Sequence, residues 1–409
     1  MPKRKSLTIP ACYGRAQRDR QCRSRYVALL TFGFGRPVAW ACLCFVNPPS
    51  VGVEEEFLLV DPSTGEPVAR NTEVARYAAE RGVELQLELT SCQVETATEV
   101  AQTSSQLRQQ INELRAVVAE SAEKAGARLL AVGLPPTVPH SFPITDKPRY
   151  RDIAERFGMI AHEQGICGCH VHVEVPDRDA AIAVSNWLRP WLPMLLALTA
   201  NSAIYRNADS GHASWRSVLW GRWPSAGPPP HFDSAEHYDA IVALMNDSGA
   251  MLDEGMVYWD VRPSEKFPTV EIRVADVPAT AAETVLLATL SRAAVMTALA
   301  AHRGGEKAPK VDDHVLRAAY WKAAHDGLDG QTIDVIEGWA TAPTSRVLGE
   351  WLGLLQPALD ELGDGEWVHA EMGRLLRDGN GAMRQRAAWR ERHDIADVVA
   401  VAAAATVET

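Results

Sequence analysis

Reactive side chains recur at every second position in three short segments of this 409-residue chain. Residues 53–57 read VEEEF, residues 169–175 read CHVHVEV and residues 269–274 read TVEIRV. Successive side chains of a β-strand point to opposite faces, so each segment, as a strand, carries its reactive groups on one face. The groups that share a face are Glu54 and Glu56, then His170, His172 and Glu174, then Glu271 and Arg273.

Carboxylates at two further positions extend this chemistry. Glu88 ends a predicted strand, Glu95 lies seven residues further on, and Arg262 shares a predicted strand face with Tyr258 and Asp260. Clustered carboxylates repel one another and are best tolerated where cations neutralise them. Hard oxygen ligands of this kind suit Mg²⁺, and Mg²⁺ commonly shares its coordination with the phosphates of a nucleotide.

Two other interpretations stay open at this stage. Any one of these strand faces also fits the solvent side of an antiparallel sheet, although lysine, a common residue on such faces, is absent from all three segments. His170 and His172 with a carboxylate also fit a zinc-dependent hydrolase, but His-x-His without a third ligand is a weak zinc signal. The sequence contains no P-loop and no dinucleotide-binding glycine motif in the right context, so a nucleotide site must be built in another way.

The elements that must position these groups alternate between strands and helices. Strands are predicted over 51–60, 83–89, 128–132, 168–175, 257–261 and 269–274. Helices are predicted over 101–125, 180–200, 281–301 and 381–405, the second of them kinked by Pro190 and Pro193. The segment 205–232, rich in Gly, Trp, Arg and Pro, is predicted as a long functional loop. No internal repeat is visible, and this favours one α+β domain.

Charge divides the chain near residue 50. The net charge is −11, yet residues 1–50 contain nine Lys or Arg, one Asp and four of the seven cysteines. We therefore predict a basic extension over 1–47, poorly structured or non-native, ahead of a folded domain over 48–400. The apolar run 26–46 superficially resembles a signal sequence or membrane segment, but Arg36 and Pro37 interrupt it. A targeting segment or a specific binding arm are the alternatives for this region.

Composition also limits the partners. The net charge of −11 argues against a nucleic-acid backbone as partner, because proteins that bind one usually carry a basic patch. No later stretch reaches about 18 uncharged apolar residues, so no membrane association is expected of the main domain. An odd number of irregularly spaced cysteines is a poor disulfide framework, which favours a reducing cytoplasm. Whether the chain forms a homo-oligomer is left open.

Several motifs between residues 50 and 280 together resemble the type 2 glutamate–cysteine ligase family of carboxylate–amine ligases. They follow the family order and are Gly52-Val-Glu-Glu-Glu-Phe57, Glu88-Leu-Thr-Ser-Cys-Gln-Val-Glu95, Gly168-Cys-His-Val-His172, Asn201-Ser, Ser210-Gly-His-Ala-Ser-Trp-Arg216, Arg222-Trp-Pro-Ser-Ala-Gly227, Tyr258-Trp-Asp-Val-Arg-Pro-Ser264 and Thr269-Val-Glu-Ile-Arg-Val-Ala-Asp276. Residues 1–47 fall outside the resemblance.

The resemblance implies a glutamine-synthetase-like catalytic fold for residues 48–400, in which an antiparallel sheet forms a funnel over metal and ATP. The implied magnesium ligands are Glu54, Glu56, Glu88, Glu95 and Glu271. His172 and Arg273 are implied to lie near phosphates, and Arg262 is implied as a further catalytic residue. Arg216 and Arg222 are implied to contact substrate carboxylate or nucleotide phosphate, an assignment that Arg262 shares.

The implied reaction activates a carboxylate before an amine attacks it. The γ-carboxylate of glutamate attacks the γ-phosphate of ATP, and the amine of cysteine then displaces phosphate from the acyl phosphate. The expected partners are therefore amino acids and ATP, with Mg²⁺ as cofactor, in the cytoplasm. Three alternatives remain: a ligase with a different acid or amine, a His/carboxylate metallohydrolase that works without ATP, and a catalytically idle binding protein of this fold.

Overall fold

The computed structural model describes side chains for residues 47–137, 142–163, 165–336 and 338–408, and the backbone of two short paired strands, β1 (Leu30–Phe32) and β2 (Arg36–Val38). The rest of residues 1–46 lies outside the described residues, so the nature of the extension proposed over 1–47 stays a prediction. The other strands are β3 (Val51–Val60), β4 (Gln86–Leu87), β5 (Gln93–Ala97), β6 (Arg128–Leu130), β7 (Gly168–Glu174), β8 (Ile204–Tyr205), β9 (Ala208–Asp209), β10 (Val261–Pro263), β11 (Thr269–Asp276), β12 (Gln331–Ile333) and β13 (Thr341–Pro343).

The helices fall into an early and a late set along the chain. The early set is α1 (Asn71–Ala79), α2 (Ser104–Lys124), α3 (Pro148–Phe157), α4 (Met159–His162), α5 (Arg178–Leu188), α6 (Leu192–Thr199), α7 (Trp215–Trp220) and α8 (Ala235–Asp247), with short 3₁₀ turns η1 (Arg189–Trp191) and η2 (Glu254–Met256). The late set is α9 (Ala281–Arg303), α10 (Asp313–Asp326), α11 (Thr344–Leu362), α12 (Gly365–Asp378), α13 (Gly381–Arg392) and α14 (Ile395–Thr406).

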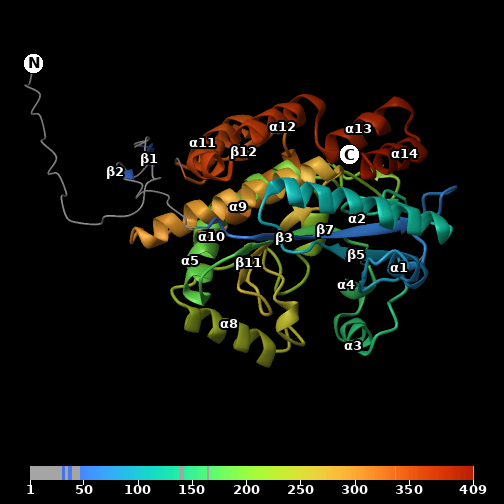
Figure 1. The fold of residues 1–409 in the computed structure, drawn as a ribbon. Helices are drawn as coiled ribbons and strands as arrows, with labels where there is room; N and C mark the ends of the chain where they lie inside the picture. Colours follow the sequence, from blue (N-terminus) through green and yellow to red (C-terminus); the bar gives the residue numbers. More distant parts are fainter. Residues whose placement is uncertain are drawn as a thin grey trace, which may run out of the picture.

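Seven of the described strands form one antiparallel sheet at the centre of the fold (Figure 1). Its strand order is β10-β11-β7-β3-β5-β4, and β6 pairs with the C-terminal part of β3. The three segments in which reactive groups alternate with apolar ones, in β3, β7 and β11, are therefore direct neighbours although they lie far apart in the sequence. The predicted α+β class with an antiparallel sheet is confirmed.

One face of the sheet is apolar and is covered by helices. Val53, Val171 and Ile272 point to this face and join the largest hydrophobic core, to which α5, α9 and α11 also contribute. Each such buried side chain contributes roughly 1.5–3 kcal/mol to folding. In Figure 1, α2 and α9 cross this face of the sheet, whereas α3 and α8 lie on the opposite side. The polar face of β3, β7 and β11 therefore looks toward α3 and α8.

Glu55 lies on the helical side of β3 and is 2% exposed. Arg115 on α2 donates to both of its carboxylate oxygens, with Nη2 2.6 Å from Oε1 and Nε 3.2 Å from Oε2. The Thr284 hydroxyl on α9 donates to the same Oε1 at 2.6 Å. Arg115 also reaches the carbonyl oxygen of Thr406 at the end of α14. This fully paired ion pair therefore joins the sheet to three helices.

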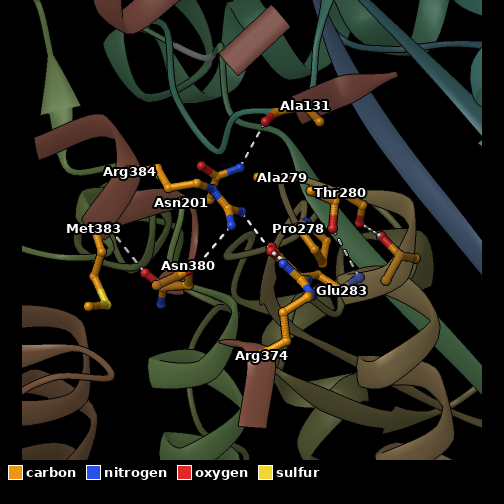
Figure 2. Close-up of polar contacts among 12 residues, drawn as sticks. Ala131, Asn201, Pro278, Ala279, Thr280, Glu283, Arg374, Asn380, Met383 and Arg384 are labelled. Atoms are coloured by element: carbon orange, nitrogen blue, oxygen red, sulfur yellow. Dashed lines mark hydrogen bonds and ion pairs between the residues drawn. The ribbon is translucent and has the colours of Figure 1, made fainter. Parts of the chain in front are cut away.

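A second buried carboxylate joins the late helices to one another. Glu283 lies in the first turn of α9, after the N-cap Thr280, and accepts from Arg384 of α13 at 2.6 Å and from Arg374 of α12 at 3.5 Å (Figure 2). In the same region Asn201 donates to the Ala131 carbonyl at 2.8 Å. The Glu283 carboxylate also lies near the positive end of the α9 helix dipole, which stabilises its negative charge. The negative charge of Glu283 is therefore paired with two arginines.

Helix α9 is long and apolar enough to cross a membrane. However, 94% of its most apolar stretch is buried inside the protein. The helix packs against α2, α5, α11 and β7. Its apolar composition is explained by this central position in the core.

The structure differs from the predicted elements in several places. The strand predicted over 83–89 is reduced to β4, and the strand predicted over 257–261 appears later as β10, because the backbone before it turns through η2. The segment 205–232 is not one loop, since it contains most of the β8–β9 pair and α7. The helix predicted over 180–200 is divided at Pro190 and Pro193, as expected, into α5, η1 and α6.

Candidate active site

The polar face of the sheet opens into a cleft of about 910 Å³. Eight acidic and four basic side chains line it among the described residues. They include most of the residues singled out from the sequence, namely Glu54, Glu56, Glu88, Glu95, His170, His172, Arg262, Glu271 and Arg273. The β-strand period thus brings these groups into one cavity that carries an excess of negative charge.

Strand register arranges the groups in rows across the sheet. Glu54 lies opposite His170, and Glu56 lies opposite Glu95. In the neighbouring row, Arg262, Glu271 and His172 follow one another from β10 through β11 to β7. Residues directly opposite each other on antiparallel strands have Cβ atoms only about 5 Å apart, so side chains in a row interact directly.

Three overlapping groups of side chains have ligand atoms within 4.8 Å of one another. They are Glu56, Glu88 and Glu95; Glu54, Glu95 and His170; and Glu54, His172 and Glu271. Carboxylate oxygens in such numbers fit hard divalent cations, and Mg²⁺ in particular. The donor set therefore matches the cofactor that the sequence predicts.

His172 supplies a more specific sign of a ligand. Its Nδ1 lies 3.1 Å from the Thr269 hydroxyl, whereas its buried Nε2 has no hydrogen-bond partner among the described residues. Nε2 lies 3.6 Å from Glu54 Oε1 and 4.0 Å from Glu271 Oε1. Buried polar atoms are rarely left without partners, so this nitrogen between two carboxylates is suited to a metal ion.

Electrostatics divide the carboxylates into two kinds. Burial, reinforced by Glu88, Glu54 and Glu56, raises the pKa of Glu95 well above its usual value. Burial also raises the pKa of Glu56, whose carboxylate accepts from the Gly168 backbone N–H at 2.6 Å. The group around Glu95 thus lacks positive charge, which is the condition that a bound cation relieves.

The other carboxylates have cationic or histidine neighbours. Burial alone would raise the pKa of Glu54, but contacts with His170 and His172 outweigh it and lower this pKa. Burial likewise opposes ionisation of Glu271, but Arg273 and Arg262 lower its pKa overall.

Two arginines from the sheet share Glu271. Arg262 Nε donates to Glu271 Oε2 at 2.9 Å, and Arg273 Nη1 donates to Oε1 of the same carboxylate. Arg273 Nε is buried without a hydrogen-bond partner in the part of the chain that the structure describes. Both guanidinium groups line the cleft, so both are held beside the candidate metal ligands.

Comparison with known proteins assigns the chain to a family. The family model described as glutamate–cysteine ligase family 2 matches residues 50–400. This chain belongs to glutamate–cysteine ligase family 2. A protein of Mycolicibacterium smegmatis, provisionally named glutamate–cysteine ligase 2-3, is 66% identical over 361 residues, which cover 88% of this chain and 99% of that protein. A provisionally named glutamate–cysteine ligase 2-1 of Nocardia farcinica is 60% identical and covers 89% and 94% of the two chains.

Solved structures share the fold of this family member at low sequence identity. A glutamate–cysteine ligase from Francisella tularensis, solved in complex with AMP, superposes with a TM-score of 0.65 at 12% identity and covers 88% of both chains. A bifunctional glutathione synthetase from Pasteurella multocida gives a TM-score of 0.62 at 16% identity, over 88% of this chain and 52% of that one. Both confirm the predicted fold.

Two arginines that the family-2 motifs singled out do not line the cleft. Arg216 is buried near the start of β7, with Nη1 3.8 Å from Asp276 Oδ1. Its Nη2 lies so close to Gly168 that a Cβ there would approach it to 2.3 Å, which explains the glycine at the start of β7. Arg222 pairs with Glu163 at 2.8 Å on a half-exposed surface. Substrate contact by either arginine therefore remains a prediction.

Sequence reasoning missed the walls of the cleft. They are formed largely by side chains from α3, from the end of α7, and from the segments around η2 and after β10. The main ones are Arg149, Tyr150, Trp220, Asp253, Lys266 and Phe267, whereas Trp223 and Tyr258 of the same walls lie in motifs that the sequence singled out. Arg149 is fixed by two hydrogen bonds to Asp253, both of 2.8 Å. The tryptophan-rich composition of 205–232 was the one available signal.

Proposed function

We propose that this protein is an ATP-dependent ligase that joins the γ-carboxylate of glutamate to the amine of cysteine. Family membership and the names of its relatives support an ATP-dependent ligase of the glutamate–cysteine type. The observation that carries the proposal is the gathering of five glutamates and two histidines on one sheet face inside a polar cleft. The cytoplasm, where ATP and free thiols are available, is the proposed location.

The residues present fit a magnesium site. Glu56, Glu88 and Glu95 would hold one cation, and Glu54, Glu271 and His172 Nε2 would hold a second. When bound, Mg²⁺ would supply positive charge that stabilises the phosphates of ATP during transfer. This assigns His172 to a metal rather than to a phosphate, because Nε2 is directed between two carboxylates.

The side chains of the chain would act by binding and orientation. Arg273 and Arg262 lie beside the second candidate metal group and are proposed to contact the transferring phosphate or a substrate carboxylate. Glu271 holds both guanidinium groups in place, so their geometry is set before substrates bind. Preorganised charge of this kind stabilises the transition state without reorganisation.

The proposed reaction has two steps. A γ-carboxylate oxygen of glutamate attacks the γ-phosphorus of ATP, the bond to the bridging oxygen breaks, and ADP leaves. The cysteine nitrogen then attacks the acyl carbon, phosphate leaves with the former carboxylate oxygen, and the nitrogen loses a proton as the amide forms. Exclusion of water from the cleft would protect the acyl phosphate from hydrolysis.

A panel of acid and amine pairs tests this proposal. The purified protein is incubated with Mg²⁺, with or without ATP, and products are identified by mass spectrometry. We expect γ-glutamylcysteine and one ADP per product, only when ATP is present. A different amide product would preserve the ligase but change its substrates. Cleavage products formed without ATP would support a metallohydrolase instead, and no product from any pair would favour an idle binding protein.

A further inference from the structure

The turn between β10 and β11 presents an exposed aromatic ring to the cleft. The Ser264 N–H donates to the Thr269 carbonyl at 2.9 Å, and the Thr269 N–H donates to the Phe267 carbonyl at 2.7 Å, so the turn is closed by its own backbone. Phe267 lines the cleft but is 58% exposed. An apolar ring that is left largely in water at the edge of a polar cavity has an unused contact surface.

The position of Phe267 relates this surface to the candidate metal groups. Its ring centroid is 6.2 Å from that of His172, and the two rings are nearly perpendicular at 87°. His172 Nε2 is directed toward Glu54 and Glu271. The Phe267 ring therefore contacts a member of the second candidate metal group (Glu54, His172 and Glu271), at the edge of the sheet formed by β10 and β11.

Positive charge accompanies the aromatic ring at this end of the cleft. Lys266 precedes Phe267, lines the cleft and is exposed, and no ion pair is found for it within the described ranges. Arg262 and Arg273 lie on the two strands that the turn connects. The four basic residues of the cleft thus include three at this end, and the fourth, Arg149, is paired with Asp253.

We infer that Phe267 is the platform on which the purine base of the nucleotide stacks, and that Lys266 contacts the phosphate chain. A nucleotide carries a flat ring and a polyphosphate on one short scaffold, which matches the sequence of aromatic ring, cations and carboxylates at this edge. Stacking on an aromatic side chain needs no base-specific hydrogen bond, because every base has a π-face. This inference rests on the proposed ATP-dependent function.

The amino-acid substrates are a poorer match for the same surface. Glutamate and cysteine carry no planar ring, and a free carboxylate gains little from an apolar face. If Phe267 instead contacted an amino acid, its removal would change the affinity for that amino acid and leave nucleotide binding unchanged.

Two probes, of which only ADP carries a base, test the inference. Dissociation constants of ADP and of inorganic triphosphate are measured by titration calorimetry in the presence of Mg²⁺, on the full chain and on Phe267→Ala. We expect Phe267→Ala to weaken ADP binding about tenfold and to leave triphosphate binding within about twofold. Phe267→Trp should retain ADP binding. Lys266→Ala should weaken both probes to a similar extent, and more strongly at low salt.

Leu376→Ala is the matched control, because Leu376 is an exposed apolar residue of α12 that does not line the cleft. Equal weakening of both probes by Phe267→Ala would overturn the inference, since it would mean that the ring acts only through His172. Unchanged ADP binding in Phe267→Ala would also overturn it. These outcomes are separate from failure of the proposed function, which is absence of an ATP-dependent product.

Discussion

Consecutive glutamates of β3 point into two different regions of the protein. In one region the carboxylates are paired with arginines, and in the other the acidic side chains outnumber the basic ones. Glu55 points to the helices, where Arg115 donates to both of its oxygens, and Glu283 at the start of α9 is paired with Arg374 and Arg384 (Figure 2). Glu54 and Glu56 point to the cleft, where acidic side chains outnumber basic ones by eight to four. The paired region is complete as it stands, whereas the cleft lacks positive charge.

The difference shows how a structural carboxylate can be told from a functional one. Buried carboxylates without compensating charge reduce the free energy of unfolding, because desolvation and repulsion disfavour their ionised form. The raised pKa of Glu95 and of Glu56 reflects this cost. A cluster that lowers stability in this way is explained best by a function. Binding of a cation that also binds phosphate is the function that fits these side chains.

The sharpest test of the comparison changes adjacent residues of β3. We expect Glu54→Gln to lower turnover at least about 100-fold, because a metal ligand loses its charge. Glu55→Gln should lower the free energy of unfolding by about 3 kcal/mol, because it leaves Arg115 buried without its counter-ion. Chemical denaturation and steady-state rates measure both effects.

This pair of variants also shows how the comparison fails. Near-wild-type turnover in Glu54→Gln would remove β3 from the metal site. A Glu55→Gln protein that is as stable as the wild type would show that the paired region does not depend on its ion pair.

The next test concerns the arginines that face the cleft. Arg273→Lys should lower the turnover number at saturating ATP about tenfold, because lysine keeps the charge but loses the planar fork that binds two oxygens. Arg386→Lys is the control, because Arg386 pairs with Asp209 at 3.2 Å and does not line the cleft. Equal turnover in both variants would place the polar face of β11 outside the chemistry.

Metal-free protein provides a test based on pH. The folded-state pKa of Glu95 is raised, so the folded protein binds this proton more tightly than the unfolded chain does. The contribution of protonated Glu95 to the free energy of unfolding is complete below the ordinary pKa near 4.5. It is lost as the pH rises through the raised folded-state pKa. In EDTA we expect the melting temperature to fall as the pH rises above about 5.

Magnesium should reverse that fall. A cation that binds only the folded state stabilises it by roughly 2.7 kcal/mol at 100 times its dissociation constant. Because Mg²⁺ binds ionised carboxylates, the melting temperature should rise more at about pH 8 than at about pH 5. Glu95→Gln should reduce both the fall and the response to Mg²⁺, whereas Glu99→Gln, at an exposed position, should reduce neither. A melting temperature that does not change on addition of Mg²⁺ at either pH would contradict the metal assignment.

The sequence predicts the sheet face well because a strand has a fixed period of two. Glu54, His172 and Glu271 could be grouped by that period alone, without knowing which strands pair. The order of the strands could not, because β3 and β7 meet through contacts more than 100 residues apart. The cleft walls were missed for the same reason, since Tyr150 and Phe267 come from elements whose packing has no local signature.

The smallest expected effect concerns Arg222, for which the family resemblance implies a contact with substrate. Its guanidinium Nη1 donates to Glu163 at 2.8 Å, both side chains are about one-third exposed, and neither residue lines the cleft. Exposed ion pairs contribute about 0–1 kcal/mol, so Arg222→Ala should change the free energy of unfolding by no more than that. We expect the Michaelis constant for ATP to change less than about twofold. The same measurement on Arg262→Ala, whose guanidinium lines the cleft, should show a much larger change. If Arg222→Ala is instead found to raise the Michaelis constant as much as Arg262→Ala does, the loop before Trp223 must close onto the substrate. Pairing with an opposite charge would then no longer distinguish the structural region from the cleft.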